Sequence, residues 1–134
     1  MKKIVDQELL EQEIKRELRN NVGEKPLTDR EAERFERAII DGVMLGLSID
    51  ELAKICCYSL STFKRRFSEQ YNIPPHRWML QCRMHLACLI LTTTDAPITS
   101  VATTCGFVNN SHFIATFRRH VGITPRQFRY QNRA

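Results

Sequence analysis

Apolar side chains recur along this chain every three or four residues, which is the spacing of helices that bury one face. Residues 6–20 predict one such helix, whose apolar positions stand among charged ones: Leu9, Leu10, Ile14 and Leu18. Residues 28–45 predict a second, with a single apolar face: Phe35, Ile39 and Val43. Polar residues from Asn20 to Pro26 separate the two helices, and Gly46 ends the second. The pattern predicts an all-α protein.

The stretch after Gly46 occurs twice. Five positions return 49 residues later, namely Ile49, Leu52, Ala53, Cys57 and Tyr58 as Ile98, Val101, Ala102, Gly106 and Phe107. After one inserted residue the interval is 50, and Phe63, Phe67, Ile73, Pro75 and Trp78 return as Phe113, Phe117, Ile123, Pro125 and Phe128. Such a match indicates a duplicated structural unit. Each copy predicts a short helix, a tight turn, a second helix and a proline-led third helix, the order of a helix-turn-helix module.

Capping residues place the starts of these helices. A Ser or Thr followed three residues later by Glu is a capping box, and the chain has two, at Thr28 with Glu31 and at Ser48 with Glu51. Ser59 is expected to cap the second helix of the first copy, and Ala53 to be the small residue where its two helices cross.

The second helix of each copy has a polar outer face. Its phenylalanines point inward, so positions on the opposite side are free to contact another molecule. In the helix predicted for residues 60–71 these are Ser61, Lys64, Arg65 and Ser68. In the helix predicted for residues 109–120 they are Asn110, Ser111, Ile114, Ala115 and Arg118. The equivalent helix of helix-turn-helix proteins enters a DNA major groove.

A long helix over about residues 76–93 connects the copies. Near 20 residues at 1.5 Å each give roughly 30 Å. One turn of B-DNA is about 34 Å, so a helix of this length can hold two recognition helices in successive major grooves. Its Trp78 is expected in the core rather than as a base-stacking platform.

Charge separates the two parts of the chain. Residues 1–47 carry nine Lys/Arg and eleven Asp/Glu, a balance of −2, whereas residues 48–134 carry eleven and four, a balance of +7. A basic balance confined to the repeated part favours a polyanionic partner there, and double-stranded DNA fits the helix-turn-helix order. The run Lys64–Arg66 is alternatively an ordinary solvated face.

Other classes of function find little support. The five cysteines are an odd number without a C-x-x-C pair, which favours reduced thiols over a disulfide framework or a metal site. No nucleophile elbow, phosphate-binding loop or His-Glu metal motif occurs, so we expect no enzyme and no cofactor. No apolar run reaches the ~18 residues of a membrane span, and residues 1–6 lack a signal region. We expect a cytoplasmic protein without a membrane partner.

These motifs resemble the DNA-binding domain of the AraC/XylS family of bacterial transcription regulators. The second copy carries most of the signature: Ile98, Val101, Ala102, Gly106, Phe107, Ser111, Phe113, Phe117, the run Gly122–Pro125, Phe128 and Arg129. The first copy matches at Leu52, Ala53, Ser59, Phe63, Arg65, Phe67, Pro75 and Arg83. The resemblance spans about residues 30–131. It implies two helix-turn-helix modules joined by a long helix, and promoter control, usually activation, through RNA polymerase.

The resemblance also implies domain limits. Residues 1–26 would be an N-terminal helical extension or linker, and residues 27–134 the DNA-binding domain. Within it, the first module would cover about 48–73, the linker helix about 75–94 and the second module about 97–123. A monomer of this kind can already engage two grooves, and a dimer stays open. The protein would lie in the cytoplasm on the nucleoid.

Site residues follow from the same resemblance. Base contacts would fall to Ser61, Lys64 and Arg65 in the first module, with Thr62 near the DNA backbone, and to Asn110, Ser111 and Ile114 in the second. Phosphate or sugar contacts would fall to Asn109, His112 and Arg118. Arg and Lys pair with guanine edges and Asn with adenine edges. Asn109 and Asn110 are alternatively turn residues only.

Two departures from the family pattern have consequences. Cys57 stands at the turn position that Gly106 takes in the second module, so a residue with a Cβ must adopt that turn. Ala115 stands where many relatives carry a basic or polar residue, beside the apolar Ile114. Ile114 can touch a thymine methyl but cannot donate a hydrogen bond. We therefore expect the first module, through Lys64 and Arg65, to supply more of the affinity.

Two questions stay open at this stage. Residues 1–47 are too short and polar to enclose a ligand, so the chain is either a small stand-alone regulator, which its initial Met slightly favours, or the C-terminal part of a longer one. The apolar stripe of residues 6–20 either packs on the domain itself or binds a partner. In the second case the chain is an interaction module with weak DNA binding of its own.

Overall fold

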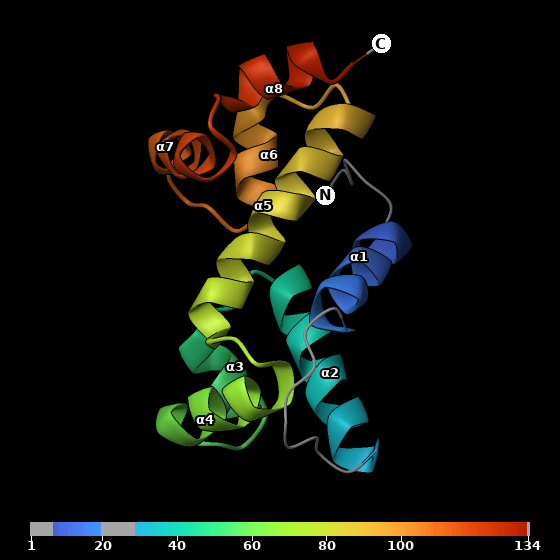
Figure 1. Ribbon diagram of the computed structural model, residues 1–134, viewed down its shortest axis with the longest axis vertical. Helices are drawn as coiled ribbons and strands as arrows, with labels where there is room; N and C mark the ends of the chain where they lie inside the picture. Colours follow the sequence, from blue (N-terminus) through green and yellow to red (C-terminus); the bar gives the residue numbers. More distant parts are fainter. Residues whose placement is uncertain (1–6, 20–28, 134) are drawn as a thin grey trace. The chain divides into compact units, whose positions relative to one another are not determined.

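The computed structural model describes residues 7–19 and 29–133, and this part of the chain is all-helical. Its helices, labelled in Figure 1, are α1 (Gln7–Arg19), α2 (Asp29–Met44), α3 (Ile49–Ile55), α4 (Leu60–Tyr71), α5 (Pro75–Thr93), α6 (Ile98–Thr104), α7 (Asn110–Val121) and α8 (Pro125–Gln131). The predicted helices are confirmed with ends within a residue or two. The capping box proposed at Thr28 and the predicted domain limit at residue 26 lie outside the described residues. None of the described helices is long and apolar enough to cross a membrane.

The chain divides into two compact units, and the division falls within α5. Of the described residues, 8–19 and 29–80 form the first unit and 81–133 belong to the second. Helix α5 therefore begins in one unit and ends in the other. Each unit contains one complete helix-turn-helix pair, α3–α4 in the first and α6–α7 in the second.

The core of the first unit is an aromatic cluster. Phe35 of α2 lies 5.5 Å from Phe63, 6.2 Å from Phe67 and 6.1 Å from Tyr71 of α4, measured between ring centroids. Trp78 of α5 adds a ring 5.6 Å from Phe67 and is fully buried, as predicted. The cluster joins three helices, so α2 is part of the module although it lies outside the repeat.

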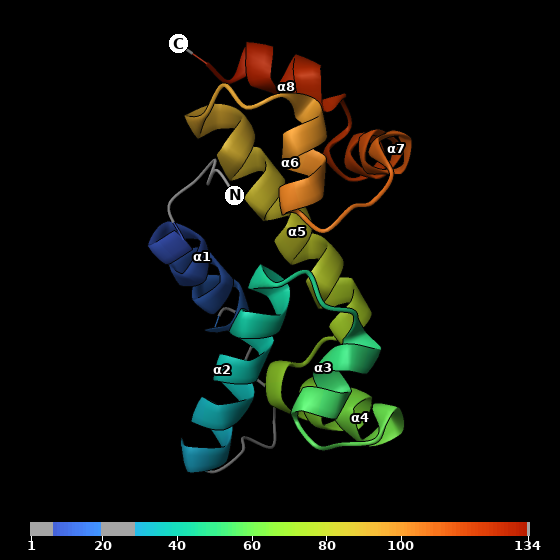
Figure 2. The same ribbon diagram turned by 180° about the vertical axis from the view of Figure 1, so that it is seen from behind.

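A short loop joins the end of α2 to α3, as both views of the ribbon show (Figures 1 and 2), and the two helices pack closely at Gly42. A Cβ on Gly42 would lie only 1.9 Å from Cδ2 of Leu52, so a larger residue at that position would force the buried Leu52 side chain to move. Ala53, which the sequence assigned to a helix crossing, is buried as well. The close approach at Gly42 could not be anticipated because it depends on how two helices meet.

Helix α1 packs on its own unit. Ile14 and Leu18 are fully buried, Leu10 is half-buried, and Leu9 is exposed. Ion pairs join α1 to α2, with Arg19 2.9 Å from Glu36 and Arg37 2.6 Å from Glu11. Most apolar side chains of α1 are thus buried in the molecule. This favours the interpretation that α1 packs on its own domain over the one in which it binds a partner.

The second unit repeats this plan with fewer rings. Phe113 and Phe117 of α7 are fully buried, together with Ile90 and Leu91 of α5. Phe128 of α8 closes the core with its ring centroid 5.6 Å from that of Phe117. Arg129 anchors α8, because its Nε donates to the Leu91 carbonyl at 3.0 Å.

The turns of the two modules have the same backbone hydrogen bonds. In the first, Cys57 N donates to Lys54 O at 3.0 Å and Tyr58 N to Ala53 O at 2.9 Å. In the second, Gly106 N donates to Thr103 O at 3.0 Å and Phe107 N to Ala102 O at 2.9 Å. The central residue is left-handed in both, with φ of 61° at Cys57 and 88° at Gly106. The expectation that a residue with a Cβ adopts this turn is confirmed.

Cys57→Gly is therefore expected to raise the free energy of unfolding. A left-handed conformation costs a residue with a Cβ about 1–2 kcal/mol, and glycine avoids that cost. Glycine also gains entropy in the unfolded chain, which offsets about 0.4–1 kcal/mol of the gain. We expect a net increase of about 0.5–1 kcal/mol, measured by urea denaturation. A clear decrease would contradict it and would mean that the thiol contributes to stability.

Candidate nucleic-acid interface

Ser59 fixes the start of the first recognition helix, α4. Its side-chain oxygen accepts from Thr62 N at 3.2 Å, and its hydroxyl lies 2.9 Å from Thr62 Oγ1. Helix α4 ends at Asn72, which is left-handed with φ of 57°. Both ends are set by local contacts, so the direction of the outer face follows from the sequence.

The outer face of α4 is polar and cationic. Ser61, Lys64 and Arg65 are exposed and Thr62 is half-buried. No carboxylate in the described part of the chain forms an ion pair with Lys64 or Arg65. Two unpaired positive charges therefore stand on one helix face. Arg66 is different, because it is half-buried and its Nε is shielded from solvent without a hydrogen-bond partner.

Asn109 fixes the start of the second recognition helix, α7. Its Oδ1 accepts from His112 N at 3.0 Å, so Asn109 is the N-cap and its side-chain oxygen is engaged. The His112 ring lies beside that of Phe107, with centroids 5.5 Å apart. The Asn109 oxygen is therefore engaged in capping α7, while the side chains of Asn109 and His112 are exposed.

Asn110 is less available than the sequence suggested. It is half-buried, and its Oδ1 is shielded from solvent without a hydrogen-bond partner. An asparagine pairs with adenine through both its oxygen and its amide group. Such a contact would require the Asn110 side chain to rotate outward.

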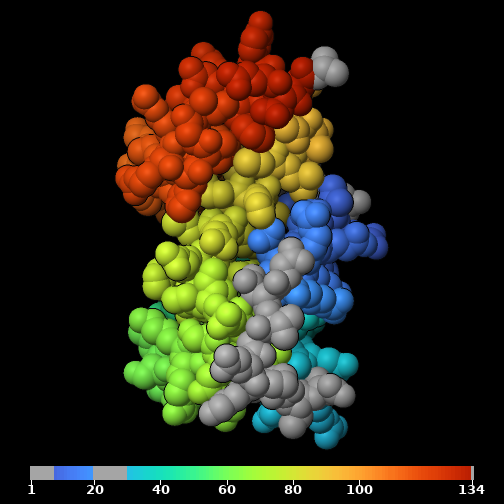
Figure 3. All heavy atoms as spheres, viewed as in Figure 1, coloured from blue at the N-terminus to red at the C-terminus, as the bar shows by residue number. Residues whose placement is uncertain are grey.

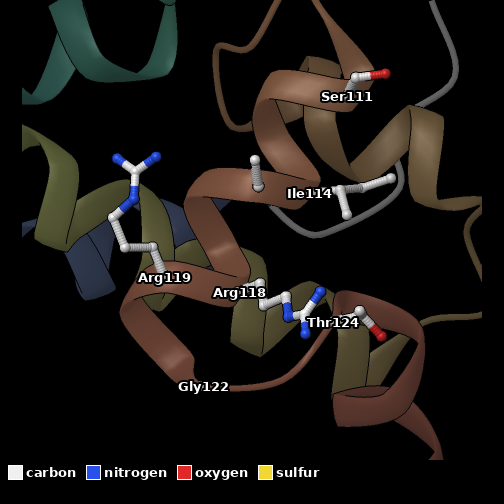
Figure 4. Close-up of a pocket in the computed structure, with 7 residues that line it drawn as sticks. Ser111, Ile114, Arg118, Arg119, Gly122 and Thr124 are labelled. Carbon is white, nitrogen blue, oxygen red and sulfur yellow. The ribbon is translucent and has the colours of Figure 1, made fainter.

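The centre of the α7 outer face is apolar and its end is basic. Ser111 and Ala115 are exposed and Ile114 is half-buried. They line an open hollow of about 620 Å³ together with Arg118, Arg119, Gly122 and Thr124. Figure 4 shows Arg118 extending toward Thr124, the N-cap of α8, and Arg119 extending from the other side of α7. In the space-filling view the α7–α8 segment forms an outer surface of its unit (Figure 3).

Three lining residues were not among the predicted contact residues, namely Arg119, Gly122 and Thr124. Arg119 follows Ala115 by four residues and so shares its helix face, a signal that the spacing already contained. Thr124 comes from the next helix start, so its position depends on how α8 packs against α7.

Arg83 of α5 packs against the turn of the second module. A Cβ on Gly106 would lie 3.2 Å from the Arg83 Nε, so the guanidinium lies directly against the turn. Burial lowers the pKa of Arg83, while the nearby Cys82 and Cys105 thiols oppose that shift. A half-buried arginine in this place packs the turn rather than contacting a ligand.

Comparison with known proteins identifies this arrangement. The family model described as a helix-turn-helix domain matches residues 52–131, from α3 to the end of α8. A solved protein of Chromobacterium violaceum with an AraC-type DNA-binding domain superposes with a TM-score of 0.64 at 27% identity, over 78% of this chain and 94% of that one. The chain belongs to the AraC/XylS family of transcriptional regulators.

Other transcription regulators match over similar lengths. The DNA-binding domain of AdpA, solved in complex with a target DNA, has a TM-score of 0.67 at 26% identity, covering 73% of this chain and 91% of that domain. The virulence regulon transcriptional activator VirF of Yersinia enterocolitica is 30% identical over 77% of this chain and 38% of its own length. The chain spans between about a quarter and about half of the length of the curated relatives. The family consists of transcription regulators, not enzymes.

Proposed function

We propose that this AraC/XylS protein binds specific sites in double-stranded DNA and activates transcription from nearby promoters. The observation that carries the proposal is the pair of exposed recognition-helix faces, on α4 and α7, each set by a capped helix-turn-helix unit. Each face would enter a major groove. The likeness to the AdpA domain with its target DNA supports duplex DNA as the ligand.

We assign the contacts by position on each helix. Ser61, Lys64 and Arg65 would contact bases, with Thr62 near the DNA backbone. On α7, Ser111 and Ile114 would contact bases, and Asn110 would join them if it rotates outward. Phosphate or sugar contacts would fall to Asn109, His112 and Arg118, and Arg119 joins this group because it lines the same hollow.

RNA polymerase is the partner that we propose for activation. VirF, which is named an activator, supports this direction of control. The protein would act in the bacterial cytoplasm, on nucleoid DNA, with a monomer sufficient for binding. Transcription in vitro from a promoter next to the selected site, with and without the protein, would test activation.

Site selection from a random duplex library would test the binding. Fluorescence anisotropy then compares the selected site with a scrambled duplex at physiological salt. We expect the selected site to bind at least about 1,000-fold more tightly, the lower range for specific DNA-binding proteins. Equal affinities would contradict sequence-specific recognition.

Thymine recognition by Ile114 gives a sharper test of α7. The half-buried isoleucine lies at the apolar centre of the face, where it would cover the methyl group of a thymine. Removing one methyl group costs about 0.8 kcal/mol, close to a fourfold loss in affinity. We expect replacement of one thymine by uracil to cause that loss with the native protein and almost none with Ile114→Ala. Equal losses in both proteins at every thymine would contradict the contact.

A further inference from the structure

Two neighbouring cysteines stand at the turn between α3 and α4. Cys56 is the C-cap residue of α3 and Cys57 is the left-handed residue that follows it. Both line one cavity of about 320 Å³ in the first unit. Its other walls come from α2 and from the ends of the turn: Glu31, Arg34, Phe35, Ala38, Ile55 and Tyr58.

The two thiols are free and differ in exposure. Cys57 is exposed, and its Sγ lies 4.0 Å from the Ile55 carbonyl oxygen. Cys56 is half-buried. Burial raises the pKa of the Cys56 thiol, and neighbouring Cys57 adds to that effect while Arg34 opposes it. A reagent from solvent therefore meets Cys57 first and Cys56 behind it.

The turn itself does not require a thiol. Its backbone hydrogen bonds are the same as those around Gly106, which has no side chain. The Cys57 side chain adds a left-handed backbone cost of about 1–2 kcal/mol that glycine avoids. Cys57 has a free thiol at the cavity wall, and a chemical function of that thiol would account for a residue that carries this cost.

We propose that Cys56 and Cys57 form a dithiol site for thiophilic electrophiles that bond to two sulfur atoms, with trivalent arsenic compounds as the ligand class. The described residues contain no group of three His, Cys, Asp or Glu that could hold a metal ion, so a zinc-type site is not formed there. An arsenic atom that bonds to two sulfur atoms needs only the thiols of Cys56 and Cys57. Cys56 is the neighbouring residue and lines the same cavity, so after Cys57 reacts the second bond forms within one molecule.

The chemistry requires no oxidant. With phenylarsine oxide as the probe, arsenic loses its bond to oxygen and forms one bond to each sulfur. The two thiol protons leave with that oxygen as one molecule of water. Arsenic stays trivalent throughout, and the product bridges Cys56 and Cys57 at the cavity.

Intact-mass spectrometry would test the site on the whole chain without DNA, so the result is independent of the proposed function. The protein is mixed with one equivalent of phenylarsine oxide and then with excess glutathione, which competes as a monothiol. We expect one retained adduct per chain that a small dithiol removes. Cys56→Ser and Cys57→Gly are expected to lose it. Cys88→Ser, which removes another half-buried thiol whose pKa burial raises, is expected to keep it.

Two results would overturn the proposal. One is a native protein that keeps no adduct against glutathione. The other is an adduct that persists in Cys57→Gly, because another pair of thiols would then hold it. Misfolding of Cys57→Gly does not explain the second result, since glycine adopts the left-handed turn freely. Circular dichroism of Cys57→Gly checks its fold directly.

Discussion

Replacing Lys64 and Arg65 together by alanine is expected to weaken binding of the selected DNA site by about 10- to 100-fold, since losing a charged base contact costs about 1–3 kcal/mol. Both side chains are exposed on one face of α4, and neither is engaged by a carboxylate in the described structure. Their full charge is thus available to DNA. The dependence of affinity on salt should also become shallower, because two fewer positive charges at the DNA surface displace fewer of its counterions. Anisotropy titrations over a salt series measure both effects.

A second double substitution provides the matched control. Lys15→Ala with Arg16→Ala removes the same two charges from α1, where Lys15 lies 3.7 Å from Glu11 and Arg16 2.6 Å from Glu13. If net charge alone governed binding, this variant would lose as much affinity as the α4 variant. We expect it to bind almost as the native protein does.

The comparison with α7 tests the predicted asymmetry. Asn110→Ala should weaken binding less than Lys64→Ala does, because the Asn110 oxygen is shielded inside the unit. Arg118 and Arg119 add charge at the end of α7, so their removal should change the salt slope more than the preference among sites. Equal losses from Lys64→Ala and Asn110→Ala would contradict the asymmetry.

Phe35→Ala is expected to lower the free energy of unfolding by about 3–5 kcal/mol, the usual cost of removing a buried phenylalanine ring. Phe35 is 4% exposed, and its ring lies within 6.3 Å of four other aromatic rings, those of Tyr58, Phe63, Phe67 and Tyr71. Its loss leaves a cavity between α2 and α4 that the surrounding side chains fill only in part. Urea denaturation measures the change.

Tyr130→Ala is the control for this core substitution. Tyr130 is 85% exposed on α8, so its replacement should change the free energy of unfolding by less than about 0.5 kcal/mol. Phe35→Ala should further speed amide hydrogen exchange in the described helices of the first unit more than in those of the second. A loss below about 1 kcal/mol for Phe35→Ala would mean that α2 contributes little to the first module.

The fold was predictable where local signals decide it. Ser48, Ser59 and Thr124 each cap a helix through hydrogen bonds to a residue three positions on, so those starts can be located from the sequence alone. The repeat likewise predicted that Cys57 adopts the conformation of Gly106, because the same turn must form in both copies.

The missing details depend on contacts between helices. Spacing places Asn110 on the outer face, but whether its oxygen is shielded depends on packing around the start of α7. The tight contact at Gly42 arises from the Leu52 side chain of another helix. Thr124 joins the α7 hollow only because α8 begins beside it. No periodicity along the chain carries this information.

Helix α5 has a consequence for how the protein folds. Only its first six residues, Pro75–Leu80, belong to the first unit, and a helix that short is unstable alone, since isolated helices need about 12–15 residues. Burial of Trp78 in the core of the first unit stabilises the first turns of α5. Burial of Ile90 and Leu91 in the core of the second unit stabilises the remaining turns. Once α5 forms in one unit, the helix can propagate along the chain to the turns that belong to the other unit. The two modules should therefore fold as one cooperative system, without requiring any direct contact between their surfaces.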